Sequence, residues 1–245
     1  MNTVLVFSGL DPGGGAGLAA DILAIAAMGA HALPVATALT VQDNEHVFEV
    51  APCDTRLIVR QADALMARFT IDAVKIGIPG SAANAVAIAG LIARLRTVHP
   101  ALPVVLDPVL SSGRGDALGQ QDALAALLKV ATLLVPNLPE AAALGPVPCP
   151  HVLVTGGHGA GDVVVNRWTH EGVARSWHWP RLDGQYHGSG CTLAAAIAAR
   201  LAQGDAMADA LARGQAFCHE ALAQSFALAP GQRIPRRYLA DVYQR

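Results

Sequence analysis

The sequence contains few lysines and few aromatic side chains. Lysine occurs only at positions 75 and 129, and aromatic residues make up 4% of the 245. Basic and acidic side chains number 17 and 19, which gives a formal net charge of −2. Because no segment is rich in lysine or arginine, the chain offers no electrostatic footprint for nucleic acid or an anionic membrane. Any phosphate group must therefore be held by local features of the fold.

Cysteine and histidine pairs at metal-ligand spacing are also missing. The four cysteines are far apart with no C-x-x-C, and the nine histidines form no H-x-x-x-H or H-E-x-x-H pattern. These spacings suggest neither a zinc site nor a disulfide framework. No stretch approaches eighteen consecutive apolar residues, and the apolar run at residues 4–7 is too short for a signal peptide. We therefore expect a cytoplasmic protein with no membrane partner.

The sequence is rich in short Val, Ile and Leu runs, each followed by a turn and a longer Ala/Leu segment. This alternation predicts a parallel β-sheet covered by helices. No stretch has linker composition and no internal repeat is present, so residues 1–245 are expected to form one domain. The predicted strands are 4–8, 33–39, 73–76, 104–106, 133–135, 151–155, 162–165 and 172–177. The predicted helices are 17–28, 55–69, 82–98, 122–130, 190–203 and 207–227.

A glycine-rich turn, GLDPGGGAG at residues 9–17, follows the first predicted strand and leads into a helix that contains Asp21. Such a turn lets backbone N–H groups approach an anion at a helix N-terminus. It does not match G-x-x-x-x-G-K-[ST], because no lysine follows, and no acidic residue stands at the next strand end for a dinucleotide. A tight strand-to-helix turn without a ligand explains the pattern equally well.

Polar residues follow other predicted strands, at the edge where parallel sheets bind ligands. Gln42 has both a donor and an acceptor, which suits the rim of a heteroaromatic ring. The neighbouring Asp43 and Asn44 indicate a turn. The carboxylate of Asp107 could position a ligand or a metal ion, or could cap a helix.

Asn137 and Glu140 lie three residues apart where a further helix is expected to begin. An amide and a carboxylate at that spacing can hold hydrated Mg²⁺ beside phosphates. The same pair also matches a helix N-cap with a capping glutamate. Both interpretations remain open from the residues alone.

The run YHGSGCT at residues 186–192 precedes a long alanine-rich helix. Small residues at a helix start expose consecutive backbone N–H groups, which can form an anion hole. A helix N-terminus also lowers the pKa of a thiol, so Cys191 could act as a base or be partly ionised. The alternative is that Cys191 is an inert, small apolar residue.

Taken together and in order, these motifs resemble the ribokinase-like superfamily, and within it the hydroxymethylpyrimidine/phosphomethylpyrimidine kinases of thiamin biosynthesis. The resemblance covers nearly the whole chain and implies a three-layer α/β/α sandwich with a mostly parallel central sheet. Cysteine at 191 stands where sugar kinases of the superfamily carry aspartate, which indicates the pyrimidine and pyridoxal branch. The matching motifs are GLDPGGGAG at 9–17 with Asp21, KIG at 75–77, DPV at 107–109, PNLPEA at 136–141, TGGH at 155–158 and HGSGCT at 187–192.

The resemblance implies ATP-dependent phosphorylation of 4-amino-5-hydroxymethyl-2-methylpyrimidine, and then of its monophosphate to the diphosphate. It implies a homodimer and two substrates, the pyrimidine and ATP, with Mg²⁺ as cofactor. The residues expected on the pyrimidine side are Gly9, Asp21, Gln42, Ile78 and Val109. The residues expected to stabilise the transferring phosphoryl group or handle the hydroxyl proton are Gly188, Ser189, Gly190 and Cys191. The residues expected to hold Mg²⁺ are Asn137 and Glu140, and those expected on the ATP side are Asp107, Thr155, Gly157 and His158.

The sequence also departs from the family pattern. Only residues 141–150 separate Glu140 from the next strand, which predicts that the usual helix there is shortened or missing. Thr155 replaces the lysine that commonly precedes Gly-Gly-His, Ile78 replaces a methionine, and Gly13 replaces a serine or threonine. These changes leave two alternatives, a pyridoxal kinase of the same superfamily and a non-catalytic pyrimidine-binding module.

Overall fold

The computed structural model describes residues 1–110 and 121–238. Its described strands form one nine-stranded sheet in the order β3-β2-β1-β4-β5-β6-β7-β8-β9. The five strand pairs from β2 to β7 are parallel, and the outer pairs β2–β3, β7–β8 and β8–β9 are antiparallel. The strands are β1 (Thr3–Leu10), β2 (His31–Gln42), β3 (Val47–Pro52), β4 (Ala73–Ile76), β5 (Val104–Leu106), β6 (Leu133–Leu134), β7 (His151–Val154), β8 (Val163–His170) and β9 (Val173–Pro180).

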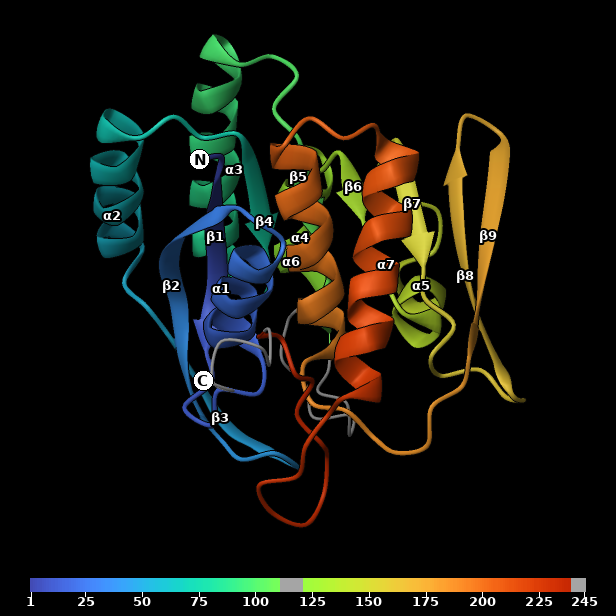
Figure 1. The fold of residues 1–245 in the computed structure, drawn as a ribbon. Helices are drawn as coiled ribbons and strands as arrows, with labels where there is room; N and C mark the ends of the chain where they lie inside the picture. Colours follow the sequence, from blue (N-terminus) through green and yellow to red (C-terminus); the bar gives the residue numbers. More distant parts are fainter. Residues whose placement is uncertain (111–120, 239–245) are drawn as a thin grey trace.

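Helices cover both faces of this sheet, and Figure 1 shows three of them, α1, α6 and α7, in front of the strands. The helices are α1 (Gly17–Ala27), α2 (Thr55–Arg68), α3 (Ala82–Val98), α4 (Gln121–Leu128), α5 (Leu138–Leu144), α6 (Ser189–Ala202) and α7 (Met207–Ala223). Buried side chains of β1 alternate between two apolar clusters, one shared with α1, α6 and α7 and the other with α2, α3 and α4. This alternation is the strand period of two and makes a three-layer sandwich. The expected mostly parallel α/β/α fold is confirmed.

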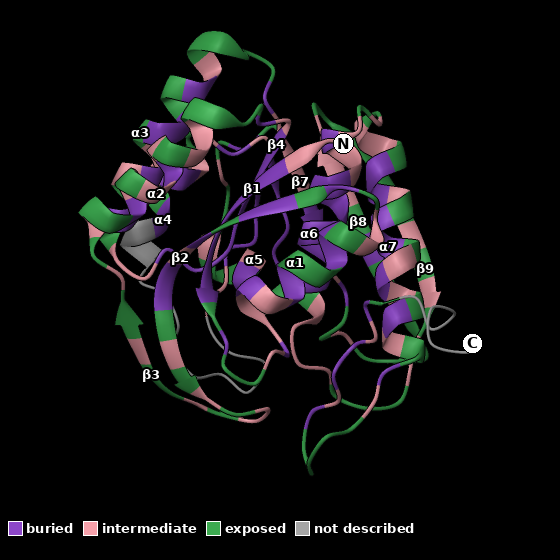
Figure 2. Ribbon diagram, turned by 60° about the vertical axis from the view of Figure 1, so that its left-hand side comes forward, coloured by how far each residue is buried: buried purple, intermediate pink, exposed green. Residues whose placement is uncertain are grey.

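The central strands are almost entirely buried, as Figure 2 shows in purple, because helices lie on both of their faces. The two edges of the sheet differ from this core. The β2–β3 ribbon carries exposed apolar side chains at Leu39, Val41 and Phe48. On β9, the half-buried Trp177 and Trp179 alternate with exposed positions.

Several predicted boundaries change in the structure. No strand was expected at β3, whose sequence VFEVAP is mostly exposed and lacks a buried apolar run. The strands β2, β8 and β9 extend at their carboxyl ends beyond the predicted ranges, because antiparallel partners pair with these residues. Helix α7 ends at Ala223 instead of residue 227, since Phe226 pairs with Ile234 in an antiparallel bridge.

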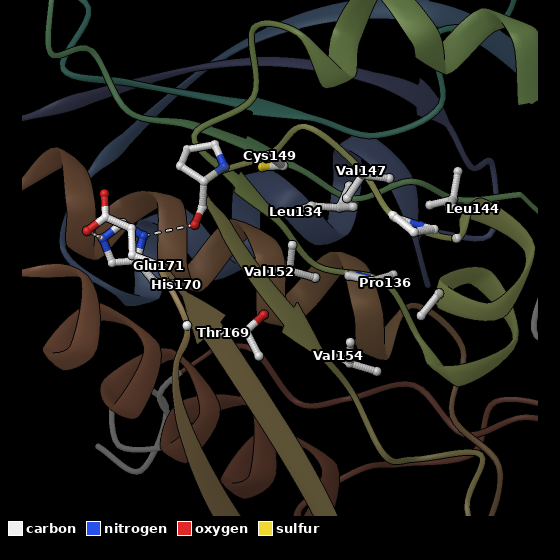
Figure 3. A pocket seen from close by; sticks show the side chains of 15 residues that line it. Leu134, Pro136, Leu144, Val147, Cys149, Val152, Val154, Thr169, His170 and Glu171 are labelled. Atoms are coloured by element: carbon white, nitrogen blue, oxygen red, sulfur yellow. Dashed lines mark hydrogen bonds and ion pairs between the residues drawn. The ribbon is translucent and has the colours of Figure 1, made fainter.

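The short crossover before β7 gives α5 only seven residues, so the predicted shortened helix is confirmed. Beside it lies a hollow of about 360 Å³ between α5 and strands β6 to β8. Figure 3 shows its lining, with His170 and Glu171 at one end, Leu144 at the other, and Leu134 and Val152 between them. Among the described residues, no helix combines the length and apolar character needed to cross a membrane.

Candidate active site

The glycine-rich turn after β1 is organised by the side chain of Asp11, which is 2% exposed. Its Oδ1 accepts a hydrogen bond from Gly13 N and its Oδ2 from Ala16 N, both at 2.8 Å. The His187 ring lies across the turn, with Nε2 2.9 Å from Asp11 Oδ2. Hydrogen bonds to Asp11 thus fix the conformation of this turn between β1 and α1. The contact with His187 connects the turn to the segment that precedes α6.

Glycines allow these two segments to approach closely. Gly188 is the N-cap of α6 and has a φ of 79°, in the left-handed region that favours glycine. A Cβ atom there would collide with the carbonyl oxygen of Gly15, and a Cβ atom at Gly15 would collide with the His187 ring. The backbone N–H groups of Ser189 and Gly190 belong to the first turn of α6. No carbonyl of the helix precedes them as an acceptor, so they can bind a ligand.

Behind this loop lies a buried charged cluster. Lys75 Nζ is 2.9 Å from Asp21 Oδ1 and 3.9 Å from Asp107 Oδ2, and both Lys75 and Asp21 side chains have no exposed surface. The charges of Lys75, Asp107 and Asp21 all act on the Cys191 thiol. Gly190 lies beside Asp107, because a Cβ atom added there would be 3.8 Å from Asp107 Oδ1.

Burial and mutual charge set the protonation states in this cluster. Burial opposes the charge of Lys75, but the carboxylates of Asp21 and Asp107 outweigh it and hold its pKa above the usual value. Burial raises the pKa of Asp107 to about 7, although Lys75 lowers it in part. Burial also raises the pKa of the Cys191 thiol to about 12. Of the two states that the sequence left open for Cys191, burial therefore favours the protonated thiol over the ionised one.

Asn137 and Glu140 form a complete capping box at the start of α5. Asn137 Oδ1 accepts from Glu140 N, and Glu140 Oε2 accepts from Asn137 N, both at 2.9 Å. The N-cap interpretation is therefore confirmed. It leaves a role in Mg²⁺ binding open, since each carboxylate oxygen has a second lone pair.

The chemistry around Asp107 fits a divalent cation. Its buried Oδ2 has no hydrogen-bond partner among the described residues, and the charge of Glu140 acts on it. Two nearby carboxylates repel each other unless a cation stands between them, and Mg²⁺ takes one or two protein carboxylates and keeps its remaining waters. No group of three acidic, histidine or cysteine side chains suited to a metal ion occurs in the described chain. The carboxylates of Asp107 and Glu140 could therefore bind a Mg²⁺ ion that keeps most of its water ligands.

A cavity of about 410 Å³ opens at the carboxyl end of the sheet, between the β8–β9 ribbon, α7 and the start of α6. Among the lining residues there is no aspartate or glutamate, and Arg181 is the sole arginine or lysine. The Arg181 guanidinium donates to the carbonyls of Gly157 (2.8 Å), Gly159 (2.8 Å) and Gly161 (2.5 Å), and so holds the loop after β7. The predicted site residues that line this cavity are Asn137, Thr155, Gly157, His158, Ser189 and Gly190.

The residues predicted on the pyrimidine side are less closely grouped. Gly9 is buried against Ile78, whose side chain fills the space that a Cβ atom would take. Gln42 stands at the end of β2 and donates to Thr40 Oγ1 at 2.7 Å. Val109 is half buried after β5.

Asp21 occupies a different place from the one expected for a ligand contact. Its side chain is buried against Lys75 and has no exposed surface. This position supports an indirect role, in which Asp21 orients Lys75 beneath the site.

Sequence reasoning did not assign a site role to Lys75, Arg181, His187 or Arg237. The signal for Lys75 was present, since a lysine in an otherwise apolar strand of a lysine-poor chain requires a buried partner. Arg237 gave no local signal, because all of its partners are far away in sequence. The turn expected at Asp43 is present, with Asp43 Oδ1 accepting from Glu45 N at 2.7 Å.

The family model and the curated proteins that match this chain belong to thiamin biosynthesis or to phosphomethylpyrimidine kinases. The chain matches the family model described as phosphomethylpyrimidine kinase over residues 11–148 and 145–235. It is 33% identical to the hydroxymethylpyrimidine/phosphomethylpyrimidine kinase of Escherichia coli over 255 residues, covering 94% of each chain. It is 36% identical to a thiamine biosynthesis multifunctional protein of Corynebacterium efficiens, covering 93% of this chain and 34% of that longer protein.

Solved structures with the same fold include kinases of two specificities. A Bacillus subtilis pyridoxal kinase in complex with ADP has a TM-score of 0.86 at 24% identity and covers 97% of both chains, which shows the fold alone. A Clostridium difficile phosphomethylpyrimidine kinase has a TM-score of 0.72 at 28% identity, covering 91% of this chain and 100% of that one. With its sequence matched over most of its length and its fold shared with these enzymes, the chain belongs to the phosphomethylpyrimidine kinase family.

Proposed function

We propose that the protein phosphorylates 4-amino-5-hydroxymethyl-2-methylpyrimidine, and then its monophosphate, with Mg·ATP as a step of thiamin biosynthesis. One observation carries this proposal. Residues from the loops after β6, β7 and β9 line a single cavity together with the glycine loop at the start of α6. A cavity without carboxylates that ends at helix N–H groups suits a polyphosphate.

The loop at residues 188–190 is proposed to stabilise charge on the transferring phosphoryl group through its backbone N–H groups. These groups are fixed before the substrate arrives, so no reorganisation is needed during transfer. A thiol with a pKa of about 12 keeps its proton at neutral pH. We therefore assign Cys191 the role of orienting the substrate hydroxyl group.

ATP is proposed to lie in the cavity, in contact with Thr155, Gly157 and His158. The carboxyl groups of Asp107 and Glu140, with the amide of Asn137, are the residues that would hold Mg²⁺. When bound, the ion would neutralise negative charge on the phosphate groups. Asp107, whose Oδ2 lies 3.9 Å from Lys75 Nζ, would then link the buried Lys75 to the cation.

The pyrimidine is proposed to lie between the glycine-rich turn and β2. Gln42 can donate to and accept from the rim of the ring, and Gly9, Ile78 and Val109 supply the apolar walls. Ile78 keeps apolar contact in place of the methionine of relatives.

The chain is also proposed to act as a single domain, in the cytoplasm, and as a homodimer. The exposed apolar side chains of the β2–β3 ribbon support the homodimer, because such a surface is stabilised by burial against a second copy.

The test is an ADP-release assay with Mg·ATP and, separately, hydroxymethylpyrimidine, its monophosphate and pyridoxal, together with calorimetric binding of each compound. We expect turnover with both pyrimidines. Greater turnover with pyridoxal would select pyridoxal kinase instead. Pyrimidine binding without ADP release would contradict the kinase proposal and favour a binding module.

A further inference from the structure

Arg237 enters the site from the C-terminal segment and is 1% exposed, the largest fully buried side chain of the described protein. Its Nε donates to Thr192 Oγ1 at 2.7 Å, and its Nη2 donates to the carbonyl of Gly15 at 2.6 Å. The same Nη2 lies 3.4 Å from the carbonyl oxygen of His187 and 3.3 Å from that of Gly188. One side chain therefore contacts both the glycine-rich turn and the loop before α6.

All of these acceptors are neutral. Within the described residues, Arg237 forms no ion pair with a carboxylate. Asp11 and Asp21 influence its charge, but His187 binds the first and Lys75 binds the second. A buried cation without a carboxylate partner is costly for the folded protein, and an anion bound nearby would offset this cost.

The two carbonyls at the loop connect Arg237 to the anion-binding N–H groups. The carbonyl of His187 belongs to the same peptide group as the N–H of Gly188, and the carbonyl of Gly188 to the same peptide group as the N–H of Ser189. A hydrogen bond to a carbonyl polarises its peptide group and strengthens the N–H as a donor. The Thr192 hydroxyl adds a second bond to the Gly188 carbonyl at 2.7 Å.

We propose that Arg237 is a positioning residue for phosphoryl transfer, which fixes the glycine-rich turn against the 187–191 loop and strengthens the N–H groups of Gly188 and Ser189 toward the transferring phosphoryl group. This inference rests on the proposed kinase function. The effect of Arg237 is largest in the transition state, where the negative charge on the phosphoryl group is greatest. Binding of the nucleotide in the ground state depends less on Arg237.

The test compares Arg237→Gln and Arg237→Lys with Arg236→Gln as the matched control. Arg236 is adjacent in sequence, but its guanidinium lies over the rings of Phe226 and Tyr238. We expect kcat to fall about 10²- to 10³-fold in Arg237→Gln, as for loss of one anion-hole donor. Arg237→Lys should recover part of this loss, since it keeps the charge, and the control should match wild type.

A binding measurement separates this role from a general structural one. Calorimetry with Mg·ADP alone should give Arg237→Gln an affinity within about threefold of wild type. Mg·ADP with aluminium fluoride, which mimics the transferring phosphoryl group, should bind at least tenfold more weakly. Equal weakening of both complexes, or a kcat within threefold of wild type, would overturn the inference.

Thr192→Val provides a second variant in case Arg237→Gln does not fold. It removes the hydroxyl that joins Arg237 to the Gly188 carbonyl while keeping the shape of the side chain. A kcat reduced about tenfold with unchanged Mg·ADP affinity would support the inference, and an unchanged kcat would overturn it. Wild-type protein that releases no ADP with any pyrimidine would instead contradict the proposed function, so the two failures are distinguishable.

Discussion

The Nζ atom of Lys75 lies 2.9 Å from a carboxylate oxygen of Asp21, and neither side chain has exposed surface. Lys75 belongs to β4 and Asp21 to α1, so the pair joins the sheet to a helix beneath the active site. The second carboxylate near Lys75, at 3.9 Å, belongs to Asp107. The site is therefore built on a buried cation that two acidic residues surround.

Replacing Lys75 should destabilise the protein strongly. In Lys75→Met, the carboxylates of Asp21 and Asp107 lose their buried counter-charge, and we expect the free energy of unfolding to fall by about 3–5 kcal/mol. Urea unfolding at pH 7 measures this change. The chain offers a direct control, because its other lysine, Lys129, is exposed, and Lys129→Met should change stability by less than ~0.5 kcal/mol. A loss below 1 kcal/mol in Lys75→Met would show that the ion pair does not stabilise the fold.

Asp107 should impose a pH dependence on stability. Its pKa is about 7 in the folded protein and near 3.8 when unfolded, so between these values the folded state keeps a proton that the unfolded state loses. The free energy of unfolding should therefore decrease as the pH rises through this window. Comparison of unfolding at pH 5 and pH 8 should show a smaller decrease in Asp107→Asn than in wild type. Equal decreases would mean that Asp107 titrates near its usual pKa.

Cys191 should be needed for turnover but not for binding of the pyrimidine. We expect Cys191→Ala to reduce kcat by about 10²-fold, because the substrate hydroxyl would lose the group proposed to orient it, while calorimetric affinity for the pyrimidine stays the same. Cys191→Ser, which keeps a polar atom, should retain more activity. Turnover like that of wild type in Cys191→Ala would remove Cys191 from the mechanism.

The raised pKa of Cys191 also predicts slow chemical modification. A thiol with a pKa of about 12 is almost entirely protonated at pH 8, and the thiolate is the reactive form. Iodoacetamide should therefore label Cys191 more slowly than free cysteine, as followed by mass spectrometry of peptides. Labelling faster than free cysteine would show an ionised thiol.

Gln42 should affect substrate binding first. Gln42→Ala would remove the proposed hydrogen bonds to the ring, and about 1.5 kcal/mol of lost binding corresponds to a KM for the pyrimidine raised ~10-fold, with kcat changed less than about twofold. Gln224→Ala is the control, since Gln224 is exposed at the end of α7 and contacts Glu220. An unchanged KM in Gln42→Ala would show that Gln42 does not contact the ring.

Charge in the nucleotide cavity should control the KM for ATP. Thr155→Lys adds a positive charge beside the proposed phosphate position, and ~1 kcal/mol of attraction would lower this KM about fivefold. Thr155→Gln, which adds length without charge, should leave it nearly unchanged. Arg181→Gln should raise it, because the cavity loses its one arginine and the loop at residues 157–161 loses its anchor. Equal KM values in the lysine and glutamine variants of Thr155 would show that phosphate does not reach this position.

The sequence by itself determined the layered α/β architecture. Few other arrangements bury the apolar faces of short strands that alternate with alanine-rich helices. It also determined features that depend on neighbouring residues. The capping box of Asn137 and Glu140, the glycine-rich turn and the shortened α5 all follow from spacing along the chain. The exposed strand β3 was missed because its residues carry no strong strand pattern.

The tertiary structure decided which polar groups meet. Lys75 and Asp21 are 54 residues apart, and Arg237 and Gly15 are 222 apart, so no local pattern links either pair. It also decided the state of Cys191, whose pKa depends on how far the folded chain removes the thiol from water. Propensity and spacing act over a few residues, whereas burial and electrostatics depend on everything that the fold brings within a few ångströms. All described elements of this protein except β3 were therefore predictable from the sequence, and the charge arrangement of its candidate active site was not.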